Sequence, residues 1–96
     1  MFDISYTNIL KLGNLPTSLQ ILYCSNNQII KLEILPTNLQ ILYCSNNNLT
    51  ELPELPDTLE YLDCENNKLP YYNLNGYIEW YAKTYPERID AKKYNI

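Results

Sequence analysis

A period of 20 residues dominates this 96-residue chain and limits what it can fold into. Three successive blocks read GNLPTSLQILYCSNNQIIKL (13–32), EILPTNLQILYCSNNNLTEL (33–52) and PELPDTLEYLDCENNKLPYY (53–72). The first two agree at 13 of 20 positions and the last two at 8 of 20. Because a fixed period of this length marks repeat architectures, each block should form one coil of a stacked array.

The repeated positions also extend toward the N-terminus. Phe2, Ile4 and Ile9 fall on the positions of Leu22, Cys24 and Ile29, although Thr7 stands where the repeats have Asn. We therefore predict a degraded N-terminal half repeat over 1–12 and three full repeats over 13–72. The positions shared by the full repeats are Leu15/Leu35/Leu55, Pro16/Pro36/Pro56, Leu19/Leu39/Leu59, Leu22/Leu42/Leu62, Cys24/Cys44/Cys64, Asn27/Asn47/Asn67 and Ile29/Leu49/Leu69.

Spacing within the repeat predicts one short strand per coil. Leu22 and Cys24 are two residues apart, so both point inward, while Ile21, Tyr23 and Ser25 point outward. The Asn-Asn pair that follows suits a turn, and the Pro-containing return leg is too short for a helix of three turns. One coil buries about six or seven apolar side chains at ~1.5–3 kcal/mol each, against ~1.5 kcal/mol per ordered residue. A coil alone cannot fold, so coils must stack.

The pattern Leu-x-x-Leu-x-Cys-x-x-Asn-x-Leu resembles the leucine-rich repeat. Its Leu-Pro-x-x-Leu lead-in is similar to the 20-residue type of bacterial effectors, and LPTSLQILYCSNN is similar to arrays of large DNA viruses of amoebae. The resemblance implies an α/β solenoid with a parallel concave sheet and an extended or polyproline-like convex side. It also implies that the Asn27-type residue bonds neighbouring backbone inside the coil, and that the chain works as an interaction module.

Residues 73–96 depart from the period and predict a C-terminal helical cap. Apolar residues from Tyr77 to Tyr85 lie on one helical face, which predicts a helix over 76–85 with Asn75 as its N-cap and Pro86 ending it. A short second helix is expected over 86–94. No comparable cap precedes the first coil, so that open edge should be covered by dimerisation, by a partner or by a longer parent chain.

Composition removes several functional classes. Eleven acidic against seven basic residues give a net charge of −4, which argues against nucleic acid. With no His, the commonest catalytic and metal sites are excluded, and we expect neither an enzyme nor a cofactor. The apolar runs are too short to span a membrane. Three Cys without a signal-peptide pattern predict an intracellular, cytoplasmic setting, which would be host cytoplasm if the chain is viral.

The cysteine ladder and the acidic run each invite a chemical interpretation. Cys24, Cys44 and Cys64 project in parallel from neighbouring strands, whereas a zinc site needs four converging ligands, so we predict small core residues. Asp63-Cys64-Glu65 superficially resembles the acidic surroundings of a ubiquitin-ligase nucleophile, but Cys64 shares the inward register. The six carboxylates between Glu51 and Glu65 are expected mostly on solvated surfaces.

The concave sheet is the predicted functional surface. Its outward columns are Ile21/Ile41/Tyr61, Tyr23/Tyr43/Asp63 and Ser25/Ser45/Glu65, an apolar and aromatic patch with an acidic corner. Such columns can also simply stabilise the sheet. We predict that a protein partner binds the face through Ile21, Tyr23, Ile41, Tyr43, Tyr61, Asp63 and Glu65. The alternatives are a structural or vestigial repeat fragment without a partner, and an adaptor that recruits targets to a separate ubiquitin-ligase or signalling enzyme.

Overall fold

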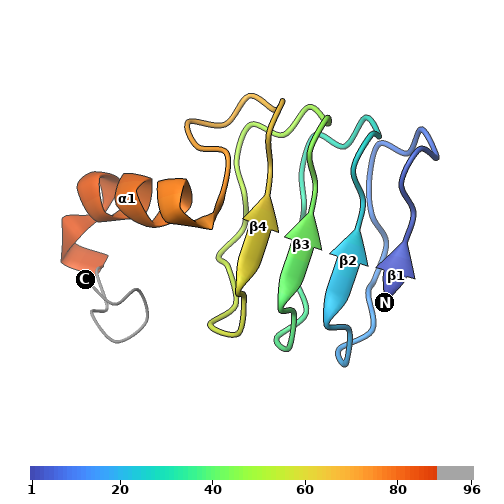
Figure 1. The fold of residues 1–96 in the computed structure, drawn as a ribbon, viewed down its shortest axis with the longest axis horizontal. Helices are drawn as coiled ribbons and strands as arrows, with labels where there is room; N and C mark the ends of the chain where they lie inside the picture. The colour runs from blue at the N-terminus through green and yellow to red at the C-terminus, as the bar shows by residue number, and fades with distance from the viewer. Residues whose placement is uncertain (89–96) are drawn as a thin grey trace.

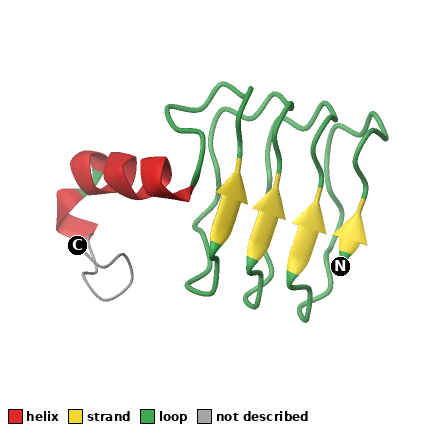
Figure 2. Cartoon of the chain, viewed as in Figure 1, coloured by secondary structure: helices red, strands yellow, loops and turns green. Residues whose placement is uncertain are grey.

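A computed structural model describes residues 1–88 and shows one open, parallel sheet with a helix at its C-terminal end (Figure 1). The strands lie side by side in chain order, and irregular return legs run behind them (Figure 2). This arrangement confirms the predicted α/β solenoid. The strands are β1 (Phe2–Asp3), β2 (Ile21–Tyr23), β3 (Ile41–Tyr43) and β4 (Tyr61–Asp63).

Strand register follows the 20-residue period. Leu42 pairs with Leu22 on one side and with Leu62 on the other, and all three side chains are buried. Cys24, Cys44 and Cys64, two residues further along, are also buried and form no disulfide. The inward ladder of Leu and Cys predicted from the sequence is therefore confirmed.

Both residues of the Asn-Asn pair have a distinct task. Asn26, Asn46 and Asn66 adopt φ values of 61°, 55° and 56°, a left-handed conformation that Asn tolerates better than most residues. The next Asn turns its amide into the coil. Asn47 Nδ2 donates to the carbonyls of Cys44 and Cys24, both at 3.1 Å, and Asn47 Oδ1 accepts the Ile29 N–H at 3.0 Å. Its amide thus bridges two coils, as the resemblance implied.

The return legs contain no helix or strand within the described residues, in agreement with the prediction. Each leg ends in a tight turn in which the second Leu of Leu-Pro-x-x-Leu donates its backbone N–H to the Pro carbonyl. The Leu39 to Pro36 bond measures 3.2 Å, and Leu19 and Leu59 make the same bond to Pro16 and Pro56. Pro suits the position because the turn needs its carbonyl and leaves its missing N–H without consequence.

The N-terminal half repeat stacks in register but has no coil in front of it. Phe2 pairs with Leu22 yet remains 42% exposed, while Ile4 and Ile9 pack partly against the core. Thr7 stands in for the missing Asn, donating its N–H to Asn27 Oδ1 at 2.9 Å and its hydroxyl to the Ile4 carbonyl. The repeat boundaries at 12/13 and 72/73, and a homodimer through this edge, stay predictions.

The opposite edge of the sheet is closed by the chain itself. Cys64 donates its N–H to the Tyr72 carbonyl at 3.0 Å, and Asp63 forms an antiparallel bridge with Asn73. This short return supplies backbone partners for the outer edge of β4 before the helix begins. A sheet edge is thereby left open only at β1 among the described residues.

The helix α1 (Leu74–Thr84) starts earlier than predicted. Its N-cap is Asn73, whose Oδ1 accepts the Gly76 N–H at 2.9 Å, so the assignment of Asn75 as N-cap and the start at 76 were wrong. Asn73 holds the role because its backbone is extended, bridging to β4, whereas Asn75 lies inside the first turn. Pro86 follows the helix end as predicted and opens a 3₁₀ turn, η1 (Pro86–Arg88). The rest of the predicted second helix, 89–94, lies outside the described residues.

Aromatic side chains attach the helix to the last coil. Tyr71 and Tyr77 are both buried, with ring centroids 5.2 Å apart in an edge-on arrangement, and Trp80 lies 5.2 Å from Tyr71. Tyr85 lies 5.8 Å from Trp80 and carries the Arg88 guanidinium 4.4 Å above its ring. These contacts cover the end of the core, as a capping helix must.

Burial suppresses the chemistry of the three thiols. It raises the pKa of Cys24 to about 12, from an ordinary value of 9.0, and the pKa of Cys44 well above that value. The pKa of Cys64 rises to about 12, through burial first and then through the Asp63 and Glu65 carboxylates. A reactive cysteine needs access and a positive neighbour, so these residues serve the core.

Truncating the central core residue Leu42 should reduce the free energy of unfolding far more than truncating Phe2, which occupies the same position in the N-terminal half repeat. We expect Leu42→Ala to lower the free energy of unfolding by ~2–5 kcal/mol, because it leaves a cavity where Leu42 is fully buried. Phe2→Ala, in the same register but half-exposed, should cost about 1 kcal/mol or less. Urea denaturation measures both values, and equal losses would show that the N-terminal coil is packed as tightly as the centre.

Stability should fall as the pH rises above about 9. Unfolded thiols ionise near their ordinary pKa of 9.0, whereas the folded thiols keep their protons to about 12, so the folded state binds more protons in between. The stability that the protonated thiols contribute to the folded state is fully present below pH 9 and is lost as the pH rises through 12. Denaturation at a series of pH values measures the slope. It should be shallower in Cys44→Ala, and an unchanged slope in that variant would contradict the thiol assignment.

Candidate protein-binding surface

The outer sheet face consists of the side chains that point away from the core: those on either side of the buried Leu in β2, β3 and β4, together with Asp3 of β1 and Glu65 just after β4. Ile21, Tyr23, Ile41 and Tyr43 are half-buried, Tyr61 is 47% exposed, Asp63 is half-buried and Glu65 is exposed. The structure thus brings all seven predicted site residues onto one side of β2–β4 and the turn after β4. Whether they bind a partner stays a prediction.

The tyrosines form one row across the strands. Tyr23 and Tyr43 stack with ring centroids 4.8 Å apart and planes 14° from parallel. Tyr61 pairs in register with Ile41, but its ring lies 5.2 Å from Tyr43. The third ring therefore joins the row diagonally from a neighbouring column, which the column-by-column interpretation of the sequence missed. Diagonal neighbours in a sheet remain within reach of aromatic side chains.

A carboxylate lies at each end of the stacked tyrosine pair. Register places Asp3 beside Tyr23 and Asp63 beside Tyr43, so the outward row reads Asp3, Tyr23, Tyr43, Asp63. Only Asp63 of these two carboxylates was predicted from the sequence. Asp3 lies 20 residues before Tyr23, and this spacing was the signal that could have found it. The two ends are built alike, since each carboxylate accepts the N–H two residues ahead: Ser5 at 3.0 Å and Glu65 at 3.2 Å.

Ser25 and Ser45 border the tyrosine row and are already hydrogen-bonded to each other. Ser25 Oγ accepts the Ser45 N–H at 3.1 Å and the Ser45 hydroxyl at 3.0 Å. Glu65 takes the same place in the third coil and is exposed. The two serines therefore bond neighbouring coils to each other. Glu65 instead extends the acidic corner next to Asp63.

Neither metal chemistry nor membrane spanning gains support from the described residues. Within 1–88 no group of three or more Cys, Asp or Glu could hold a metal ion. In the same range no helix combines the length and apolar character that crossing a bilayer requires. The outer sheet face offers aromatic rings, two Ile side chains and carboxylates, which are groups for recognition.

Comparisons with known proteins agree with this geometry. A sequence profile for leucine-rich repeats in two copies matches residues 37–75, and a single-repeat profile matches 18–37. No curated protein shows significant sequence similarity to the chain. Among solved structures, the leucine-rich-repeat domain of a Shigella effector is 40% identical, with a TM-score of 0.68 over 70% of this chain.

The match covers 31% of the Shigella domain, so this chain corresponds to less than a third of its length. Leucine-rich-repeat domains generally mediate protein–protein interactions. Repeat profiles, identity and shared architecture together show that the chain belongs to the leucine-rich repeat family.

Proposed function

We propose that the chain is a non-enzymatic interaction module whose outer sheet face binds a protein partner. The observation that carries the proposal is the row of three contacting tyrosines, with Asp3 and Asp63 at the ends of its stacked pair. Tyrosine rings provide large, rigid contact areas that lose little side-chain entropy on binding, and they are enriched in protein interfaces.

Charge favours a partner with apolar and basic groups. Three carboxylates belong to this surface, those of Asp3, Asp63 and Glu65, and the strands β1–β4 contain no Lys or Arg. A partner that places an apolar side chain against the rings and basic side chains at the ends would be complementary.

Size limits the expected affinity. Four strands about 4.8 Å apart span roughly 15 Å, so the face is smaller than the ~800 Å² per partner of a standard interface. Binding should therefore be weak and transient unless neighbouring segments contribute.

An adaptor role is a second candidate, favoured by the similarity to a domain of a bacterial effector. It would use the same face to hold a target. The structural-fragment alternative makes the opposite prediction, since no partner should then depend on the tyrosines.

The tyrosine row should be required for binding and contribute little to folding. We expect Tyr43→Ala to weaken binding of a captured partner by about tenfold or more, while lowering the free energy of unfolding by about 1 kcal/mol through lost ring stacking. The measurement is affinity capture from cell lysate, followed by calorimetry with the purified partner. Ile30→Ala, 60% exposed and outside β2–β4, is the control and should bind normally.

Two results would count against the proposal. If the captured protein binds Tyr43→Ala as tightly as the original chain, the outer sheet face is not the binding surface. If no protein is captured by either, the structural-fragment alternative gains support.

A further inference from the structure

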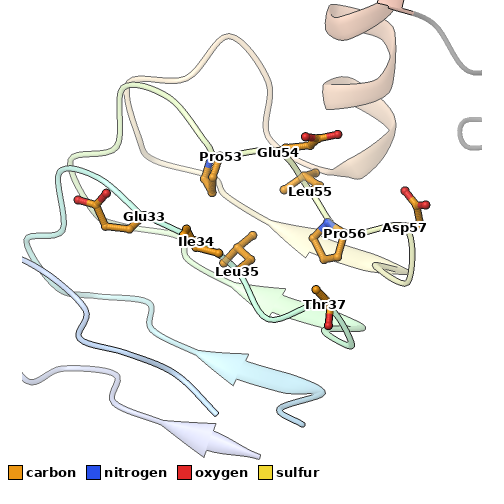
Figure 3. Close-up of a pocket in the computed structure, with 9 residues that line it drawn as sticks. All are labelled: Glu33, Ile34, Leu35, Thr37, Pro53, Glu54, Leu55, Pro56 and Asp57. Atoms are coloured by element: carbon orange, nitrogen blue, oxygen red, sulfur yellow. The ribbon is translucent and has the colours of Figure 1, made fainter. Parts of the chain in front are cut away.

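The side of the solenoid opposite the sheet carries two grooves between successive return legs. One, of about 630 Å³, lies between residues 11–17 and 33–37. The other, of about 500 Å³, lies between residues 33–37 and 53–57 and is drawn in Figure 3. We call this second one the acidic groove. Both volumes are in the range of ligand pockets, about 300–1,000 Å³.

The acidic groove has an apolar lining. Leu35 and Leu55 are buried residues that line it, and Pro53 and Pro56 lie along the second leg (Figure 3). Ile34 adds a side chain that is 86% exposed, although it is large and apolar. Prolines offer no N–H, so much of this wall can contact a ligand only through apolar surface or carbonyl oxygens.

Carboxylates surround this lining. Glu33, Glu54 and Asp57 lie at the periphery in Figure 3, and no Lys or Arg of residues 1–88 lines the groove. The other groove differs because Lys11 lies among its lining residues together with Glu33, so its charges balance.

The difference comes from the third repeat, which breaks the pattern of the first two. Glu54 stands where they have Asn14 and Ile34, and Asp57 stands where they have Thr17 and Thr37. Both carboxylate side chains are exposed, while the intervening Leu55 remains buried.

We propose that the acidic groove binds a short, extended peptide that carries alternating basic and apolar side chains. Apolar side chains would cover Ile34 and the prolines, and basic side chains would approach the three carboxylates. The groove lies between two return legs, whereas the tyrosine row lies on the opposite side of the coil. This interaction is therefore independent of the function proposed for the sheet.

An NMR titration tests the proposal on the full chain. The probe is the capped peptide Arg-Leu-Lys-Pro-Lys-Leu, and the control is the same peptide with every basic residue replaced by Glu. We expect saturable shifts of the backbone amides of Glu54, Leu55 and Asp57, and none with the acidic control. Shifts confined to residues 13–17 or to the strands would overturn the proposal, as would equal binding of both peptides.

Two matched variants separate the groove from the overall negative charge. Glu33→Lys and Glu60→Lys change the net charge equally, but only Glu33 lines the groove, and both positions are exposed. Glu33→Lys should weaken binding about fivefold and Glu60→Lys less than about twofold. Equal losses would mean that the peptide senses only the net charge, which would refute the proposal.

A third variant tests the apolar contact. Ile34→Asp should fold normally, because the side chain is 86% exposed, and should weaken binding by about fivefold or more. Ile30→Asp, 60% exposed outside the groove, provides the control. Unchanged affinity in Ile34→Asp would contradict the proposed contact, and the milder Ile34→Ala answers the same question if the charged variant unfolds.

Discussion

One asparagine amide in each full repeat holds its coil to the one before it. Asn67 repeats the bonds of Asn47: its Nδ2 donates to the Cys64 and Cys44 carbonyls, and its Oδ1 accepts the Leu49 N–H at 2.9 Å. Each amide thus satisfies backbone groups that the turn would otherwise bury unpaired. Since these bonds always reach back one coil, they fix the rise of the solenoid, and the strands and the Leu and Cys ladders follow in register.

This division of labour leaves the outward side chains free to vary. Side chains directed into the coil are nearly identical in all three repeats, while the third repeat replaces outward Tyr and Ser by Asp63 and Glu65 and adds Glu54 and Asp57 on its return leg. Both surfaces of the last coil therefore become acidic without a change in its core. Under the two proposals above, a protein partner would contact the sheet and a basic peptide would contact the opposite side of this coil.

Periodicity made most of the fold predictable, because one motif in three registers specifies strand, turn and inward ladder together. It could not choose between Asn73 and Asn75 as the N-cap, since both suit the position and the choice depends on the bridge from Asn73 to β4. The contact of Tyr61 with Tyr43 depends on side-chain direction across columns, which register alone does not specify. Asp3 escaped notice because its coil is degraded in sequence but intact in pairing.

The role of the amide ladder can be measured by comparing Asn47→Ala with Asn48→Ala in urea denaturation. Asn47 is buried and bonds two coils through its side chain, whereas Asn48 is exposed and contributes a backbone N–H to the Ile29 carbonyl that alanine retains. We expect Asn47→Ala to lower the free energy of unfolding by about 3 kcal/mol, while Asn48→Ala should change it by less than about 0.5 kcal/mol. Equal effects of the two substitutions would show that the asparagine amides do not hold the coils together.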